Sequence, residues 1–319
     1  MKINNAIILI LSIINFLTAQ PIKIVGVPII VSPKDKYFIS PKWSPNLKYI
    51  SVTEPKYNGI YVISLKDKKI HQITDELSAG YKYQWSPDGK FIAAKVNKKQ
   101  FDKIYSAIKI FEIPSGKFII IKEYNKDDSG FPLWTKDGKS IYLNFYDQLK
   151  MFPVFNKQEQ NGYENLIYVK DNKLYLYNPQ KDTEINILDQ LKIELSNFRI
   201  IDTAISPDHN KIAIETTASL VYILSLRENI TYKLPDANSV SWSPDSKHLV
   251  FCKSTDDGHN FISSDIYIST WDGKNLFQIT NTPDKIELSP SWSPDGKWIV
   301  YSLFNSGKIL IQKITYLEN

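Results

Sequence analysis

Short apolar runs separated by polar turns dominate the chain. Typical runs are Phe91-Ile92-Ala93-Ala94 and Trp298-Ile299-Val300-Tyr301. Runs of this length, rich in β-branched and aromatic residues, are typical of strands that are buried on both faces. Because no long amphipathic helix lies between them, the pattern predicts an all-β fold.

One turn motif recurs before many of these runs. A Trp or Ile leads into a Ser-Pro-Asp-Gly-like turn, and the copies begin at Trp43, Trp85, Trp134, Ile205, Trp242 and Trp292. Pro suits the second position of a type I turn, and Gly accepts a positive φ after it. Each copy therefore predicts a tight hairpin between two strands.

A second polar-turned hairpin follows most copies, as in the segments 60–65 and 70–74. Two hairpins per repeat make a four-stranded antiparallel blade, and such blades pack radially into a β-propeller. The copies are 42, 49, 71, 37 and 50 residues apart. The longest gap predicts one blade with an extra hairpin at about 147–172. We therefore expect six blades, with seven as the alternative.

The ends of the chain predict how the ring closes. The last motif is followed by only two apolar runs, so its blade lacks an outer strand. The run Ile22 to Val31 precedes the first motif and has no partner of its own. Pairing this run with the last blade would close the ring and cover both sheet edges.

Residues 1–19 resemble a secretory signal peptide. Lys2 precedes an apolar segment from Ala6 to Phe16, and a small residue stands at Ala19. This pattern predicts cleavage after Ala19 and no membrane-spanning segment afterwards, because the apolar segment is too short to cross a bilayer. We expect one propeller domain at 20–319 in the periplasm or outside the cell.

Composition narrows the class of ligand. The chain of 319 residues has a net charge of +5, and its Lys residues are spread along the sequence. A nucleic-acid-binding protein would more often gather its basic residues into one stripe, so we expect no nucleic-acid partner. A lysine also follows five of the motif turns: Lys48, Lys90, Lys139, Lys247 and Lys297. These lysines are either ordinary solvated side chains or a ring of positive charge that binds an acidic partner.

The repeated Trp-Ser-Pro-Asp-Gly stretch resembles the WD40-like propeller repeat of TolB-type proteins. The full motif stands at Trp85 to Gly89 and at Trp292 to Gly296, and it decays in the other copies. The resemblance covers roughly residues 30–319 and implies the fold. TolB itself carries a further α/β domain before its propeller, for which this chain leaves no room between Ala19 and Trp43. The resemblance therefore implies a bare propeller without a complete TolB function.

Few residues suit catalysis. A catalytic metal needs about three protein ligands, and the His residues, among them His209 and His248 at motif turns, are expected to be solvated. No G-x-S-x-G nucleophile motif occurs. Segments 127–130 and 256–260 hold calcium-friendly side chains without the usual spacing, so no cofactor is predicted and Ca²⁺ stays an alternative.

Long, dissimilar loops are predicted on the face opposite the motif turns, where function usually concentrates. Their aromatic side chains are candidate anchors for a protein or peptide partner: Phe101, Tyr105, Phe152, Phe155, Tyr163 and Phe261. The motif tryptophans are instead expected to pack between blades: Trp43, Trp85, Trp134, Trp242 and Trp292.

The sequence therefore predicts an exported, non-catalytic module that binds or scaffolds another envelope or secreted protein. Two alternatives stay open: a propeller hydrolase or lyase acting on a carbohydrate or lactone, and a structural subunit of an extracellular assembly.

Overall fold

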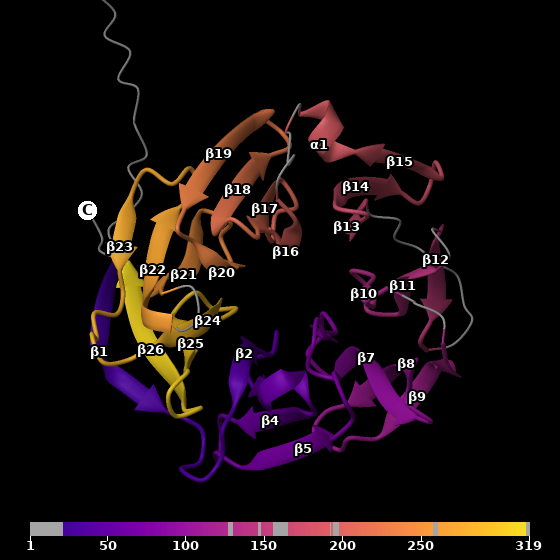
Figure 1. The fold of residues 1–319 in the computed structure, drawn as a ribbon, viewed down its shortest axis with the longest axis horizontal. Helices are drawn as coiled ribbons and strands as arrows, with labels where there is room; N and C mark the ends of the chain where they lie inside the picture. The colour runs from indigo at the N-terminus through magenta and orange to yellow at the C-terminus, as the bar shows by residue number, and fades with distance from the viewer. Residues whose placement is uncertain are drawn as a thin grey trace, which may run out of the picture.

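A computed structural model describes residues 22–126, 130–145, 148–155, 165–191, 193, 198–257 and 261–316, which form seven sheets arranged as a ring. Figure 1, viewed down the ring axis, shows the sheets one after another in chain order. All paired strands within these described sheets are antiparallel. The chain is a β-propeller, and we number its blades 1 to 7 from the N-terminus.

Blades 1 to 3 occupy the first half of the chain. Blade 1 contains β2 (Ile39–Trp43), β3 (Tyr49–Thr53), β4 (Ile60–Ser64) and β5 (Ile70–Thr74), with the 3-10 turn η1 (Pro55–Tyr57) between β3 and β4. Blade 2 contains β6 (Gln84–Trp85), β7 (Phe91–Gln100), β8 (Lys103–Glu112) and β9 (Phe118–Asn125). Blade 3 contains β10 (Leu133–Trp134), β11 (Ser140–Phe145) and β12 (Gln148–Pro153).

Blades 4 to 6 follow around the ring. Blade 4 contains β13 (Leu166–Lys170), β14 (Lys173–Asn178) and β15 (Thr183–Asn186), after which the short helix α1 (Ile187–Gln190) begins. Blade 5 contains β16 (Ile200–Ile205), β17 (Lys211–Thr216), β18 (Leu220–Ser225) and β19 (Ile230–Pro235). Blade 6 contains β20 (Asn238–Trp242), β21 (His248–Asp256), β22 (Phe261–Thr270) and β23 (Leu276–Gln278).

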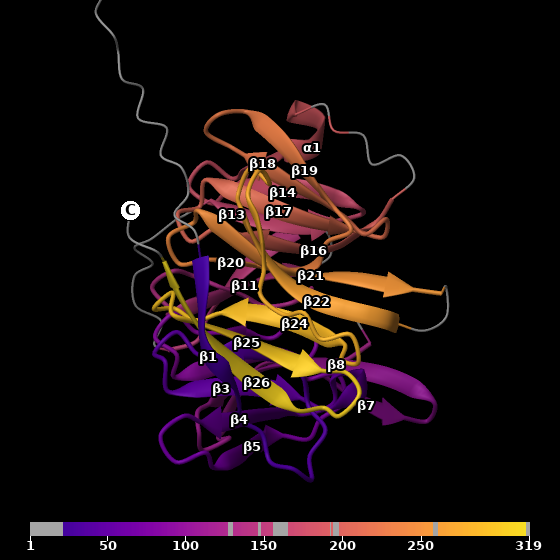
Figure 2. The same ribbon diagram turned by 90° about the vertical axis from the view of Figure 1, so that its left-hand side faces the viewer.

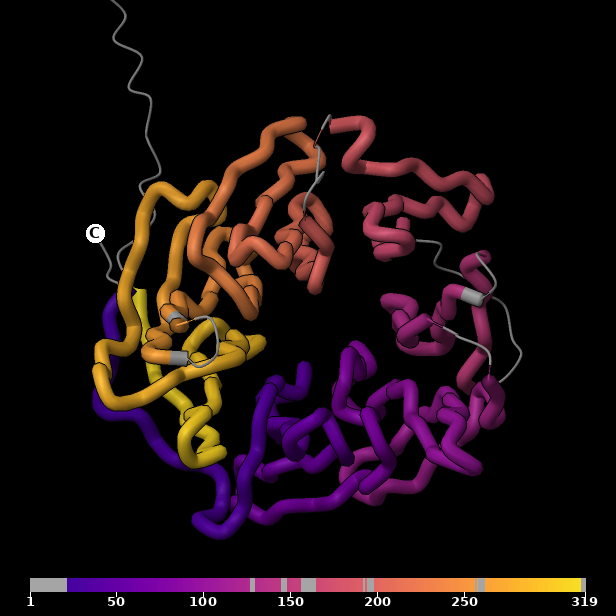
Figure 3. The backbone as a smooth tube through the Cα atoms, in the orientation of Figure 1, coloured from indigo at the N-terminus to yellow at the C-terminus, as the bar shows by residue number. Residues whose placement is uncertain are grey.

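Blade 7 is built from both ends of the chain. It contains β24 (Glu287–Trp292), β25 (Trp298–Leu303), β26 (Ile309–Tyr316) and, as outer strand, β1 (Ile22–Ile30). β1 pairs antiparallel with β26 from Ile22 opposite Tyr316 to Ile30 opposite Leu310. Figure 3 shows this first segment lying beside the last one. The predicted closure of the ring by the N-terminal strand is confirmed.

The expected count of six blades is wrong, and seven is correct for the described residues. The described chain after Trp134 forms six strands up to Ile205, and these divide between two three-stranded sheets and the first strand of blade 5. Blade 4 carries no Trp-turn motif, so the motif count missed it. Consequently the extra hairpin expected at 147–172 is not an insertion: β12 completes blade 3 and β13 begins blade 4.

The motif turns have the predicted hydrogen bonds. In blade 2, Gly89 N donates to Ser86 O (2.9 Å), and Gly89 has a φ of +67°. The Ser86 hydroxyl donates to Asp88 Oδ1 (2.7 Å) and accepts from Phe91 N (2.9 Å). A residue other than Gly takes the same left-handed conformation where the motif decays, at Leu47, His209 and Ser246. These three positions carry backbone strain that Gly would not.

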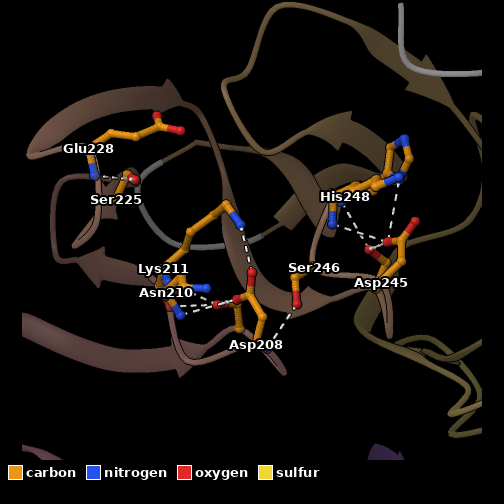
Figure 4. A network of polar contacts seen from close by, with 11 residues as sticks. Asp208, Asn210, Lys211, Ser225, Glu228, Asp245, Ser246 and His248 are labelled. Atoms are coloured by element: carbon orange, nitrogen blue, oxygen red, sulfur yellow. Dashed lines mark hydrogen bonds and ion pairs between the residues drawn. The ribbon is translucent and has the colours of Figure 1, made fainter. Parts of the chain in front are cut away.

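Motif turns of neighbouring blades touch one another. Asn46 Nδ2 donates to Gly89 O (2.8 Å), and Asp208 N donates to Ser246 Oγ (3.0 Å). Figure 4 shows the second of these contacts, between blades 5 and 6, beside the Lys211–Asp208 ion pair of 3.1 Å. We call this side of the ring the motif-turn face.

Four of the motif tryptophans join their blade to the preceding one. The indole Nε1 of Trp43 donates to Ser291 O (3.2 Å), that of Trp134 to Gln84 O (3.2 Å) and that of Trp242 to Ala204 O (2.9 Å). Trp85 donates to Ser51 Oγ (2.9 Å), which in turn donates to Lys42 O. The Nε1 of Trp292 is buried without an acceptor. The indoles thus lie between blades.

Apolar side chains fill the junctions between blades. Within the described residues, six buried clusters each combine two neighbouring blades, for instance Val62 of blade 1 with Ile92 of blade 2. Cys252 belongs to one of them; it is fully buried, and burial raises its pKa to about 12. Burial of this apolar surface is the main force that holds the blades together.

The opposite side of the ring carries the longer connections, and we call it the long-loop face. It includes the β3–β4 connection (54–59), the β5–β6 connection (75–83) and the β7–β8 turn (101–102). Figure 2 shows the β7–β8 and β21–β22 hairpins projecting beyond the ring in one direction. A rigid ring therefore presents irregular segments on this face, as the sequence indicates.

Candidate functional site at the ring axis

One position of the repeat lies at the start of the innermost strands, on the long-loop face. It is the third residue before the motif Trp or Ile: Ser40, Lys82, Phe131, Asp202, Ser239 and Ser289. The register is irregular at this point in β2, β20 and β24. Ser40, Lys82, Ser239 and Ser289 have φ between +52° and +55°. Left-handed residues of this kind are strained, and such strain is often kept where it positions a functional group.

Two of these residues meet across the ring. Lys82 Nζ of blade 2 lies 3.3 Å from Asp202 Oδ1 of blade 5 and also donates to Ile201 O (3.0 Å). Because blades 2 and 5 are not neighbours, this ion pair must cross the region around the axis. The side chains are 31% and 56% exposed, so solvent reaches the pair.

A second cation, Lys42 of β2, lies beside this pair. Its Nζ lies 4.8 Å from the centre of the Tyr83 ring and 3.4 Å from Tyr83 O. Desolvation by the surrounding ring lowers the pKa of Lys42, although its side chain is exposed to solvent; the charge of Asp202 opposes the shift, and that of Lys82 adds to it. Since the side chain still contacts solvent, a ligand entering along the axis can reach it.

Glu215 of β17 approaches the same region from blade 5. Its carboxylate accepts hydrogen bonds from Ser239 N (2.9 Å) and Val240 N, at the irregular start of β20. Burial raises the pKa of Glu215 to about 7, although these two backbone bonds oppose the shift. The carboxyl group therefore titrates near neutral pH while it holds the strained strand of blade 6.

A pocket of about 180 Å³ opens next to Lys82 on the long-loop face. Its lining comes from four connections and strands of blades 1 to 3: Lys56, Tyr57, Ser78, Tyr81, Lys95, Asn97 and Phe131. Tyr57, Tyr81 and Phe131 form a row of edge-to-face rings, with centroids 5.1 and 5.3 Å apart. We call the pocket together with Lys42, Lys82 and Asp202 the axial site.

The axial site is cationic. Lys95 Nζ lies 5.4 Å and Lys82 Nζ 5.9 Å from the Phe131 ring centre. The described residues that line the pocket include no acidic side chain, and Asp202 is already paired with Lys82. Lysines beside aromatic rings suit a carboxylate attached to an apolar or aromatic body, because the lysines attract the charge and the rings cover the rest.

The structure places the six predicted anchor residues in separate regions. Phe101, at the tip of the β7–β8 hairpin, is 87% exposed. Tyr105 lies on β8 of the same hairpin and is half-buried. The Tyr163 prediction lies outside the described residues, and of Phe261 only the backbone, in β22, is described.

Phe152 and Phe155 do not lie on the long-loop face. β12 runs back toward the motif turns, so both residues lie at the motif-turn end of blade 3. Phe152 packs against the cluster between blades 2 and 3, and the Phe155 ring lies 4.7 Å from that of Phe91. The interpretation of 147–172 as an extra hairpin caused this misplacement.

The axial residues were missed by sequence reasoning, although a signal for them exists. Lys82, Phe131 and Asp202 share the same offset from the motif hydrophobe, and Lys42 stands directly before Trp43. Aligning the repeats on the Trp position would have gathered these charged and aromatic residues at one level of the ring.

The histidines and acidic segments do not form a metal site in the part of the chain that is described. No group of three or more His, Cys, Asp or Glu side chains there could hold a metal ion. His209 is exposed as expected, but His248 is buried, packed 5.6 Å from the Tyr316 ring. The calcium-friendly segments lie largely outside the described residues.

Solved structures with similar folds exist. A protein described as a TolB candidate from Agrobacterium tumefaciens superposes with a TM-score of 0.54 over 91% of this chain and 94% of that chain, at 17% sequence identity. This chain has a TolB-like propeller fold. Oligogalacturonate lyase from Vibrio parahaemolyticus gives a TM-score of 0.48 at 10% identity, over 86% of this chain and 76% of that one. At these identities the likeness concerns the fold alone.

No protein-family model matches the sequence. No curated protein matches it either. Among the described residues, no helix has the length and apolarity needed to cross a bilayer.

Proposed function

We propose that this propeller is an exported binding module that holds an acidic segment of another protein or peptide at the axial site. The single observation that carries the proposal is the pocket in which Lys56 lies beside the Tyr57–Tyr81–Phe131 row, with no acidic side chain among the described residues that line it. Lys82 and Lys42 extend the positive charge toward the axis. An Asp, Glu or C-terminal carboxylate with a neighbouring aromatic residue fits this chemistry.

The projecting hairpins support the same face as the contact surface. Phe101 and Ile104 on β7–β8 are 87% and 63% exposed, and Ile262 on β22 is 61% exposed. Exposed apolar tips around a cationic pocket suit a partner that inserts an acidic residue and covers the hairpins.

A labelled peptide alternating Glu and Tyr, and its Gln-for-Glu twin, test the proposal by fluorescence anisotropy. We expect binding of the acidic peptide that weakens with salt, and at least about tenfold weaker binding by Lys56→Gln. Lys297→Gln, on the exposed motif-turn face, is the matched control and should bind normally. Equal binding of the two peptides, or equal weakening by both variants, would contradict an axial carboxylate site.

A second candidate function rests on Lys42. A lysine whose pKa is lowered by burial beside a carboxylate can act as a general base, so the axial site could instead belong to a hydrolase or lyase acting on a carbohydrate or lactone. Turnover of an anionic oligosaccharide that disappears in Lys42→Met would favour catalysis. Tight binding of the acidic peptide without turnover of any sugar or lactone tested would favour the binding module.

Export is a separate part of the proposal, because residues 1–19 lie outside the described part of the chain. N-terminal sequencing of the protein from fractionated cells tests it. We expect a chain that begins at Gln20 in the periplasmic or extracellular fraction.

A further inference from the structure

A second pocket lies away from the axis, where blade 6 meets blade 7. It has a volume of about 250 Å³ and is bounded by β1, by the β23–β24 connection and by strands β24 to β26. Apolar side chains form most of its wall: Ile24, Val27, Pro28, Ile279, Leu303 and Leu310. The outer strand that closes the ring therefore also closes this pocket.

The polar end of the pocket is the carboxyl group of Glu287, the first residue of β24. Glu287 is 1% exposed. One carboxylate oxygen, Oε1, accepts from the Thr282 hydroxyl, while Oε2 is buried and has no hydrogen-bond partner in the described part of the chain. Within the described residues no ion pair reaches this carboxylate.

The surroundings of Glu287 do not neutralise it. Burial raises its pKa, and the neighbouring charge of Asp265 raises it further, whereas the Thr282 hydrogen bond and Lys285 oppose the shift. Lys285 lies on the rim with its side chain in solvent, so its charge is screened. A buried carboxylate with one unpaired oxygen is costly, and a cationic donor placed in the pocket would remove that cost.

The remaining groups decide which cation fits. A divalent metal needs six or more oxygen ligands or three strong donors, and Glu287 brings the single carboxylate among the described residues that line the pocket. The long apolar wall suits an alkyl chain instead. Gln312 is fixed by bonds from its Nε2 to Val25 O (3.1 Å) and Lys313 O (3.0 Å), so this side of the pocket is held in place.

We propose that this pocket binds an aliphatic primary ammonium group, with the ammonium donating to Glu287 Oε2 and the alkyl stem lying against Ile279, Leu303 and Leu310. The ammonium can come from a free alkylamine or from a lysine side chain of a partner. The two sources share the same chemistry and are separated by the probes below. This site is independent of the axial site and of the acidic ligand proposed there.

The test measures calorimetric binding of n-butylammonium and of Nα-acetyl-lysine methylamide to the full chain, with n-butanol as the uncharged match. We expect saturable binding of at least one amine, no comparable binding of n-butanol, and at least about tenfold weaker binding by Glu287→Gln. Binding of the acidic peptide at the axis should be unchanged in that variant. Binding of butylammonium alone assigns a free amine, and binding of the lysine derivative assigns a side chain.

Leu303→Trp provides a second variant, which fills the pocket from its wall and leaves Glu287 in place. It should also abolish amine binding, and circular dichroism shows whether each variant folds. The proposal is overturned if neither amine binds the wild-type chain, if n-butanol binds equally well, or if folded Leu303→Trp retains full amine affinity. A buried water or a proton on Glu287 is then the simpler partner of Oε2.

Discussion

Lys82 and Asp202 are 120 residues apart in the sequence and form an ion pair of 3.3 Å between blades 2 and 5. Each stands three residues before the motif hydrophobe of its blade. The same repeat position thus provides a cation on one side of the axis and an anion on the other. Asp202 already pairs with the Lys82 ammonium group, so it competes with any ligand carboxylate for that cation.

Removing either partner of this pair should change ligand affinity in opposite directions. Asp202→Asn frees Lys82 and should tighten binding of the acidic peptide severalfold, whereas Lys82→Gln should weaken it. Because both side chains are partly exposed, each variant should alter the free energy of unfolding by less than about 1 kcal/mol. Anisotropy titrations and urea unfolding measure the two effects. Weaker binding by Asp202→Asn would show that the pair itself forms the binding surface.

Two motif tryptophans with different indole partners offer a matched comparison. Trp242 Nε1 donates to Ala204 O, whereas Trp292 Nε1 is buried without an acceptor, and the two side chains are 7% and 5% exposed. Replacement by Phe removes the indole N–H from both. We expect Trp242→Phe to lower the free energy of unfolding by about 1–2 kcal/mol more than Trp292→Phe. Chemical denaturation measures this difference in the free energy of unfolding. Equal losses in the two variants would show that the packing of the indole ring, and not its hydrogen bond, sets its contribution to stability.

His209 occupies the turn position where complete motifs have Gly. Its φ is +57°, and its side chain is exposed. His209→Gly should therefore raise the free energy of unfolding by about 1 kcal/mol, because Gly adopts this conformation without steric strain. Gly296→Ala is the reverse control, because Gly296 has a φ of +73° in the intact motif. This variant should have a lower free energy of unfolding than the wild type. Urea midpoints of both variants check the prediction, which a loss in His209→Gly would refute.

Glu215 should make the free energy of unfolding depend on pH, over the interval between the pKa of this residue in the unfolded chain and its pKa in the folded protein. Burial raises the pKa from the ordinary value of 4.5 to about 7. The folded state holds the proton more tightly, so the contribution of Glu215 is fully present below about pH 4.5 and is lost as pH rises through about 7.

Glu215→Gln keeps an acceptor for the blade 6 backbone and cannot ionise. The difference in unfolding free energy between wild type and this variant should therefore shift in favour of the variant from pH 4.5 to 7 and level off above it. Exposed Glu228→Gln serves as the control and should leave the profile unchanged. A difference that is constant with pH would show that folding leaves the pKa of Glu215 unchanged.

Local chemistry in the sequence was sufficient for the repeating parts of the structure. The Ser-Pro-Asp-Gly turns, the strands after them and the pairing of 22–31 with the last blade could be predicted because each depends on nearby residues or on an edge that lacks a partner. The blade without a Trp-turn motif could not be counted, because its strands carry no such mark and only sheet pairing assigns them.

Only the tertiary structure decided which side chains meet. Closure of the seven-bladed ring brings Lys82 to Asp202, and it places Glu287 beside the outer strand β1. The number of blades determines which blades face each other across the axis. That number depends on how well large apolar faces pack between successive sheets, a sum over many residues that no single motif encodes. The sequence by itself determined the wedge-shaped unit, and packing around the axis determined its chemistry.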